Sequence, residues 1–184
     1  IKKLMKGKIA MYDHHHLNLL SFYMNAPRYK PYIYPYGANT PTSRRYSIQL
    51  KDYGPDPFVT DIEEATKQNN AFRIALWTGN HLQITLMSIN VGEDIGLEMH
   101  PNVDQFIRIE EGQGIIVMGD EKEHLDFQKR VDDDDIIIIP AGKWHNLINT
   151  GHTPLKLYSI YAPPEHPHGT VHNTKADAEK DHTH

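Results

Sequence analysis

Glu98, His100, Gln105 and His145 are residues of types that bind metals, and they lie in two short segments of the chain. Glu98 and His100 are two positions apart, so an extended strand would point both side chains to one face. Gln105 can return to that face on the strand that follows the next turn, and His145 would complete the set from the second segment. Imidazole, carboxylate and amide oxygen together suit a divalent first-row metal (Mn, Fe, Co, Ni or Zn), with positions left open for water or substrate. We therefore predict one divalent transition metal at these four residues.

Taken singly, each of these residues has an ordinary interpretation. A Glu and a His two apart on a strand usually face solvent, and a Pro-x-Gly turn followed by His is common in loops. The neutral amide oxygen of Gln105 is a weak metal ligand. It either binds the metal directly or accepts a hydrogen bond from a metal-bound water. The prediction of a metal site depends on the joint spacing of the four.

The second segment resembles the second motif of the cupin family, G-x5-P-x-G-x2-H-x3-N. Pro140, Gly142, His145 and Asn149 all stand at the family's spacing. Asp134 occupies the place of the leading glycine.

The first segment resembles the first cupin motif, G-x5-H-x-H-x4-E-x6-G, in register but not in every residue. Gly92, His100 and Gly112 are in place, while Glu98 replaces the first His and Gln105 the Glu. The four metal ligands of the family include one carboxylate, and the four candidate ligands here also include one. The two replacements therefore leave the charge of the ligand set unchanged. The ligand types are also similar to those of cupin-type phosphomannose isomerases, although there the Gln precedes the His and the Glu comes later.

From Phe72 onward, short apolar or alternating segments bounded by Gly, Asn, Asp and Pro predict β-strands. Evenly spaced strands of this kind fit an antiparallel jelly-roll barrel, the double-stranded β-helix that the cupin resemblance also implies. We expect strands at 72–78, 81–90, 96–100, 105–111, 114–119, 126–131, 135–140, 145–149 and 155–162. The fold class is therefore all-β, with an N-terminal extended arm and a short helix.

The chain divides by composition into an arm at 1–58, a barrel at 59–162 and a polar, His-rich tail at 163–184. Tyr and Pro alternate in much of the arm, which either wraps the barrel, reaches a partner subunit or is mobile. Thr60 and Glu63 are placed as a capping box for a short helix at 60–68. The tail either folds over the barrel mouth or lies on the surface, and we expect it to fray after Thr174.

The acidic run at 132–135 precedes four isoleucines at 136–139. It lacks the glycine and the later Glu of a calcium-binding EF-hand loop. We interpret it as a solvated loop that enters a fully buried strand.

Composition narrows the function. The 184 residues suffice for one catalytic domain, and the absence of cysteine excludes disulfides, thiolate metal sites and cysteine nucleophiles within this sequence. A net charge of −5 without a dense Lys/Arg stripe argues against nucleic acid or membrane as partner and favours a small-molecule substrate. The lysine-rich start is not followed by an apolar segment, so we expect a cytoplasmic location.

We expect a metal-dependent enzyme on a small polar metabolite, with sugar or sugar-phosphate isomerisation preferred. Candidate catalytic residues are His81, Lys143, His166 and His168. Strand alternation places Arg108 on the opposite face from Gln105, which favours a structural or interface role for Arg108.

An iron- or nickel-dependent oxygenase is the second interpretation, because two His and one carboxylate suffice for it. A non-catalytic metabolite-binding module is the third. Exposed sheet edges in such barrels favour a homodimer.

Overall fold

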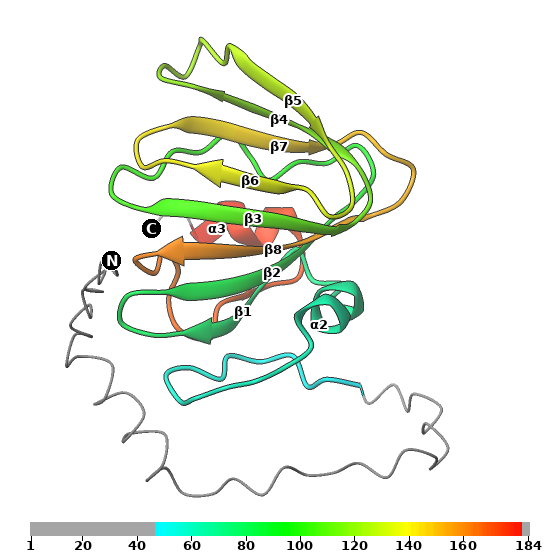
Figure 1. Ribbon diagram of the computed structural model, residues 1–184, viewed down its shortest axis with the longest axis vertical. Helices are drawn as coiled ribbons and strands as arrows, with labels where there is room; N and C mark the ends of the chain where they lie inside the picture. The colour runs from blue at the N-terminus through cyan, green and yellow to red at the C-terminus, as the bar shows by residue number, and fades with distance from the viewer. Residues whose placement is uncertain (1–46, 182–184) are drawn as a thin grey trace, which may run out of the picture. The chain divides into compact units, whose positions relative to one another are not determined.

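The computed structural model describes residues 47–181, which form two antiparallel sheets and two short helices (Figure 1). The elements in chain order are α2 (Ile62–Gln68), β1 (Arg73–Thr78), β2 (Gln83–Ile89), β3 (Asp104–Glu111), β4 (Gly114–Gly119), β5 (Phe127–Val131), β6 (Ile136–Ile139), β7 (Trp144–Asn149), β8 (Leu155–Ala162), β9 (Val171–His172) and α3 (Lys175–Asp181).

The larger sheet has the strand order β6-β3-β8-β2-β1-β9, and the smaller has the order β5-β4-β7. The main core cluster takes side chains from both sheets, among them Met87, Ile107 and Leu157 from the larger and Ile116 and Leu147 from the smaller. The core therefore lies between the sheets, as in an antiparallel double-stranded β-helix. This confirms the predicted fold class.

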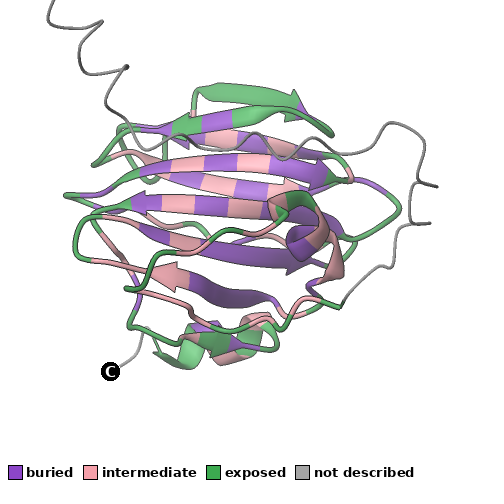
Figure 2. Cartoon of the chain, turned by 60° about the horizontal axis from the view of Figure 1, so that its bottom comes forward, coloured by how far each residue is buried: buried purple, intermediate pink, exposed green. Residues whose placement is uncertain are grey.

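Eight of the nine predicted strands are present with closely similar bounds. The exception is 96–100, where Glu98 forms an isolated antiparallel bridge with His145 in place of a regular strand. Figure 2 shows buried positions alternating with less buried ones along several strands, the pattern from which the strands were predicted.

The barrel interior is polar at one end and apolar at the other. The inward side of β8 changes from Leu157 to Ser159 and Tyr161 along the chain, and all three are fully buried. Antiparallel pairing places Tyr161 beside Gln83 of β2 and Gln105 of β3. Buried polar groups are therefore concentrated at one end of the barrel, where a site can form.

A second apolar cluster lies on the other face of β1 and β2. It contains Ile74, Leu76 and Leu86 with Ala65 of α2, and partly buried side chains of the segment 47–58 pack on it. This part of the predicted arm therefore covers the sheet, whereas the part at 1–46 lies outside the described residues.

Helix α2 begins one residue later than a Thr60 cap would require. Its N-cap is Asp61, whose carboxylate accepts a hydrogen bond from the Glu64 backbone N–H at 3.0 Å. The predicted Thr60–Glu63 capping box is therefore wrong, because Asp61 supplies the capping oxygen instead.

Strand β6 is not fully buried, contrary to our expectation. It pairs with β3 and ends the larger sheet, and Ile136 and Ile138 are 57% and 55% exposed while Ile137 and Ile139 face the core. Asp134, just before it, has a φ of 71°, a backbone conformation that explains why the cupin motif has glycine there.

The tail is ordered further than we expected. Val171–His172 pairs with β1, and Lys175–Asp181 forms helix α3, with Ala178 buried in the core cluster. We predicted that the chain frays after Thr174. This is wrong for residues 175–181, because they form α3, which contributes Ala178 to the core.

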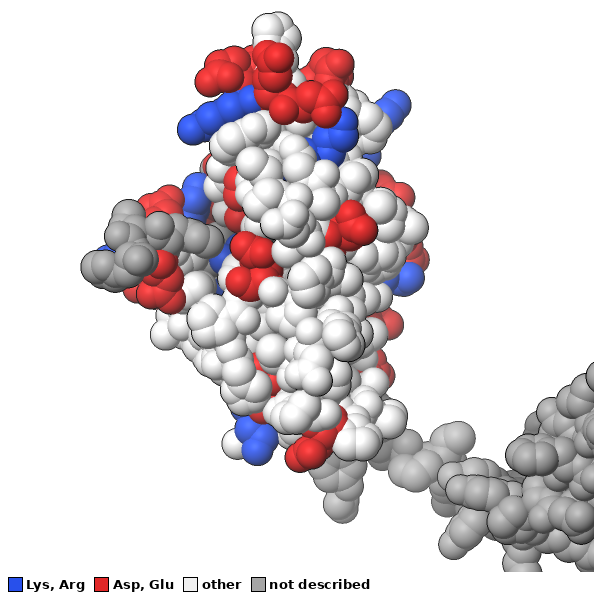
Figure 3. Space-filling model, turned by 90° about the vertical axis from the view of Figure 1, so that its left-hand side faces the viewer, with Lys and Arg blue, Asp and Glu red and all other residues white. Residues whose placement is uncertain are grey.

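Acidic and basic side chains are dispersed over much of the molecule's face in Figure 3, with acidic ones gathered at its upper end. Within residues 47–181, no helix has the length and hydropathy needed to cross a bilayer.

Candidate metal centre

Glu98 and His145 are brought together by backbone pairing. The Glu98 N–H donates to the His145 carbonyl at 3.0 Å, and the His145 N–H donates to the Glu98 carbonyl at 2.9 Å. The loop before β7 is fixed on the same segment, because the Gly142 N–H donates to the His100 carbonyl at 2.8 Å. Gly142 has a φ of +81°, a conformation that favours glycine and accounts for the glycine of this turn.

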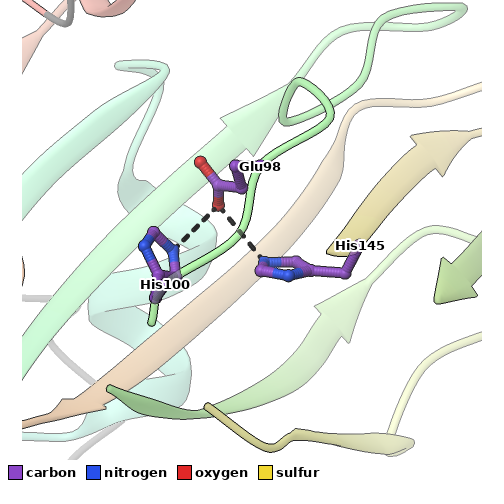
Figure 4. Close-up of side chains that lie close together, drawn as sticks. All are labelled: Glu98, His100 and His145. Carbon is purple, nitrogen blue, oxygen red and sulfur yellow. Dashed lines mark ion pairs between the residues drawn. The ribbon is translucent and has the colours of Figure 1, made fainter. Parts of the chain in front are cut away.

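Glu98, His100 and His145 point toward one another at the polar end of the barrel (Figure 4). One ligand atom from each lies within 4.8 Å of the others. The Glu98 Oε1 atom is 3.4 Å from His100 Nε2 and 3.5 Å from His145 Nε2. All three side chains are largely buried, so the group is shielded from bulk water.

The partners of the other two ring nitrogens fix the histidine tautomers. His145 Nδ1 lies 2.9 Å from the Lys143 carbonyl, which can only accept, so Nδ1 carries the proton. His100 Nδ1 lies 3.1 Å from the Glu165 carboxylate and donates to it in the same way. In the neutral rings both Nε2 atoms therefore present lone pairs toward Glu98, and a carboxylate facing two lone pairs needs a cation between them.

The unpaired atoms match the predicted ligands. Glu98 Oε1, His100 Nε2, Gln105 Oε1 and His145 Nε2 are all buried and make no hydrogen bond. Gln105 donates from Nε2 to Ser159 Oγ at 3.3 Å, which leaves its carbonyl oxygen as the unpaired atom. Buried polar atoms are rarely left unpaired, so this donor set fits a divalent metal.

The electrostatics of the site favour positive charge beside Glu98. Burial alone would raise the pKa of Glu98, but His100 and His145 lower it well below its usual range. Burial alone would lower the pKa of His100, but Glu98 and Glu165 outweigh that effect and raise it.

A cavity of about 510 Å³ opens beside the three residues. Its wall includes Glu98, His100, Trp144, Glu165 and Arg73. A space of this size suits a small metabolite that reaches the metal ligands.

The structure brings one of the four candidate catalytic residues close to the site. His166 is buried, and its ring lies edge-on to Tyr161 with centroids 5.1 Å apart. Its backbone N–H donates to Gln83 Oε1 at 2.9 Å, which holds the tail against the barrel. The expectation that the tail folds over the barrel mouth agrees with this contact.

The other three lie elsewhere. His81 is exposed in the turn between β1 and β2. The ammonium of Lys143 pairs with Asp120, and His168 is 57% exposed beside Asp52. Arg108 forms ion pairs with Glu110 and Asp134, which agrees with the structural alternative of the two roles expected for it.

Three residues of the site were not predicted from the sequence: Arg73, Tyr161 and Glu165. Tyr161 is fully buried with its ring 5.9 Å from that of His100, and burial raises its pKa. Glu165 is the acceptor that orients His100. Only the proximity of Glu165 to His166 in the tail marked it, whereas nothing in their segments distinguished Arg73 or Tyr161 from ordinary strand residues.

Comparison with known proteins identifies the family. Residues 85–161 match the family model of the cupin domain. Uncharacterized protein YrkC of Bacillus subtilis (strain 168) is 70% identical over 132 residues, which are 72% of this chain and 71% of YrkC.

Two crystal structures are similar to this chain in fold. BH2720 of Bacillus halodurans, solved at 1.41 Å, has 66% identity and a TM-score of 0.71, and the match covers 71% of this chain and 99% of BH2720. An uncharacterized conserved protein with a double-stranded beta-helix domain from Klebsiella pneumoniae has 17% identity and a TM-score of 0.50, covers 65% of this chain and 100% of its own, and shows the fold alone. With its two-sheet barrel and its matched motifs, the chain belongs to the cupin superfamily.

Proposed function

We propose that this cupin is an enzyme that uses one divalent transition metal to act on a small polar metabolite, with isomerisation of a sugar-type substrate as the preferred reaction. The observation that carries the proposal is that four buried ligand atoms, one each from Glu98, His100, Gln105 and His145, make no hydrogen bond. Glu98 and His100 line the adjoining cavity, through which a substrate would reach the site.

The metal would be held by Glu98, His100 and His145, with Gln105 as fourth ligand or as a hydrogen-bond partner of a metal-bound water. When bound, it would polarise oxygen atoms of the substrate and stabilise negative charge that develops on them.

The protein's own residues would orient the ligands and move protons. The Lys143 carbonyl and the Glu165 carboxylate fix the two imidazole rings through their Nδ1 atoms. Glu165 also lines the cavity with its side chain 27% exposed, so it can accept a proton from a bound substrate. The buried hydroxyl of Tyr161 and the ring of His166 supply further groups for proton transfer near His100.

An iron- or nickel-dependent oxygenase is the second candidate. The clustered residues comprise two histidines and one carboxylate, the ligand set of many non-haem iron enzymes that activate oxygen. Metal identity separates the two candidates, because isomerisation requires no redox change.

The first test is metal content by mass spectrometry on protein purified without added metal. We expect about one metal per chain in the wild type and its loss in His145→Ala and in Glu98→Ala, because each removes a ligand. His168→Ala is the matched control, since it removes an exposed histidine outside the site. Iron or nickel would direct the next assay to oxygen uptake, and manganese or zinc to aldose–ketose exchange.

Two results would contradict the proposal: no metal in the wild type even after reconstitution, or metal retained in both ligand variants. Circular dichroism of each variant separates loss of the ligand from loss of the fold. Tight binding of a metabolite without turnover would favour the non-catalytic interpretation.

A further inference from the structure

Arg73 is a buried cation without a hydrogen-bond partner on two of its nitrogen atoms. It is the first residue of β1, its side chain is 1% exposed, and its Nε and Nη1 atoms are both unpaired. Strand pairing places it opposite Met87, which faces the barrel interior. A fully buried guanidinium is rare in proteins unless it is paired, so this one has a specific reason to be there.

Arg73 shares its cavity with the candidate metal centre. It lines the same space as Glu98, His100 and Glu165. The guanidinium carbon lies 5.6 Å from the ring centroid of Phe72, and this contact holds the side chain against one wall.

The other charged groups on the cavity wall have partners or lie near solvent. The ammonium of Lys175 lies 2.7 Å from Asp94 Oδ1, and the Glu165 carboxylate accepts from His100. Glu179 belongs to the exposed side of α3. Among the described lining residues, Arg73 is thus the cation whose buried donors are unpaired.

We infer that the substrate of the proposed metal enzyme is a small carboxylate, whose carboxylate group binds Arg73 while another of its oxygen atoms faces the metal ligands. The inference rests on the proposed function for the second contact. It assigns to Arg73 a role in substrate binding that strand periodicity alone does not reveal.

The chemistry of the donors favours a carboxylate over the alternatives. The N–H groups of a guanidinium lie in one plane and donate in pairs to the two oxygens of a carboxylate, and two of the Arg73 nitrogen atoms, Nε and Nη1, have no partner in the protein. A phosphate dianion would favour a second unpaired cation, and Lys175 is already paired with Asp94. A neutral sugar would leave the guanidinium charge uncompensated in a buried place once the metal has neutralised Glu98.

The test compares binding of matched probes by the metal-loaded protein. Gluconate and sorbitol differ in that a carboxylate replaces a terminal CH₂OH, and glycolate, malate and inorganic phosphate complete the panel. Calorimetry should show binding of at least one carboxylate but neither sorbitol nor phosphate. In Arg73→Met that binding should weaken roughly 10- to 100-fold, as expected for loss of a charge-assisted hydrogen-bond pair.

Two further measurements separate substrate binding from a structural role. If Arg73 is kept unpaired for a ligand, ligand-free Arg73→Met should have a melting temperature equal to or above that of the wild type, because a buried unpaired charge is removed. A structural role predicts a lower melting temperature instead. Arg73→Lys should keep the charge but lose the bidentate geometry and bind with intermediate affinity.

The inference would be overturned if no carboxylate in the panel binds, if affinity is unchanged in Arg73→Met, or if phosphate or sorbitol binds instead. Metal content of Arg73→Met should equal that of the wild type, since Arg73 is not a ligand. If the protein binds no metal but still binds a carboxylate in a manner that depends on Arg73, the proposed function is wrong. The role of Arg73 in anion binding would then still stand.

Discussion

At the scale of single residues, Gln105 is the most informative departure from the cupin motif. Its position in β3 corresponds to the motif's glutamate, and its carbonyl oxygen is buried and unpaired while its amide nitrogen donates to Ser159. An amide oxygen carries no charge, so Glu98 is the single anionic group among the four candidate ligands. The cupin motif also has one anionic residue among these four positions. Here Glu98 replaces the first His of the motif and Gln105 replaces its Glu, so the total charge is the same.

We expect Gln105→Met to weaken metal binding by roughly 10- to 100-fold, whether Gln105 binds the metal directly or through a water. Ser159→Ala is the matched control, because it removes the hydrogen bond from Gln105 Nε2 but leaves the carbonyl oxygen. Competition with a chelator measures both affinities. Equal affinities for Gln105→Met and the wild type would show that Gln105 has no part in metal binding.

At the scale of elements, Asp52 connects three segments around the sheet. Its Oδ1 accepts from the Gly54 N–H at 2.9 Å, and its Oδ2 accepts from Thr78 Oγ1 at 2.6 Å and from the Gly169 N–H at 2.9 Å. The segment 47–58, the end of β1 and the loop before β9 are thereby joined at one carboxylate.

Replacing Asp52 with Asn should lower the free energy of unfolding by roughly 1–3 kcal/mol at neutral pH, because an amide cannot accept from all three donors. Burial alone would raise the pKa of Asp52, but these hydrogen bonds lower it below 3.8. Between the lowered pKa and 3.8, the Asp52 carboxyl therefore binds fewer protons in the native state than in the unfolded chain.

The stabilisation from Asp52 is thus complete above pH 3.8 and lost as the pH falls through the lowered pKa of the folded state. Denaturation in urea at several pH values should show that the difference in free energy of unfolding between the wild type and Asp52→Asn becomes smaller only in strong acid. Asp56→Asn, at a nearby exposed position, should change neither stability nor its pH dependence. A gap of constant size across that acid range would contradict the carboxylate's role.

At the scale of the whole molecule, the edge of the larger sheet at β6 is the feature that favours self-association. Ile136 and Ile138 are more than half exposed on this strand, and Phe127 of β5 is 45% exposed. An edge strand with exposed apolar side chains readily pairs with another chain. We therefore expect a homodimer that uses this edge.

The double variant Ile136→Lys with Ile138→Lys should be monomeric by light scattering after size-exclusion chromatography, because two buried ammonium groups would oppose pairing of the edges. Val59→Lys is the control, since Val59 is 96% exposed away from β6 and its variant should remain dimeric. A monomeric wild type would contradict this prediction.

The sequence by itself determined the fold class, the positions of most strands and the metal-binding types at Glu98, His100 and His145. These follow from local information: period-two alternation, Gly and Pro at turns, and a motif whose spacing survives substitution. The N-cap of α2, the one-sided exposure of β6 and the order of α3 escaped prediction. Each of them depends on which neighbour satisfies a donor or covers an apolar side chain.

Only the tertiary structure decided what surrounds the candidate metal ligands. Arg73, Tyr161 and Glu165 come from β1, β8 and the loop after it, and no spacing along the chain relates them to Glu98. Their burial and the absence of partners for Arg73 arise from pairing between strands that are distant in sequence. Alternation tells which face of a strand is inside, but only the assembled barrel shows which inward groups meet and which charge is left unpaired.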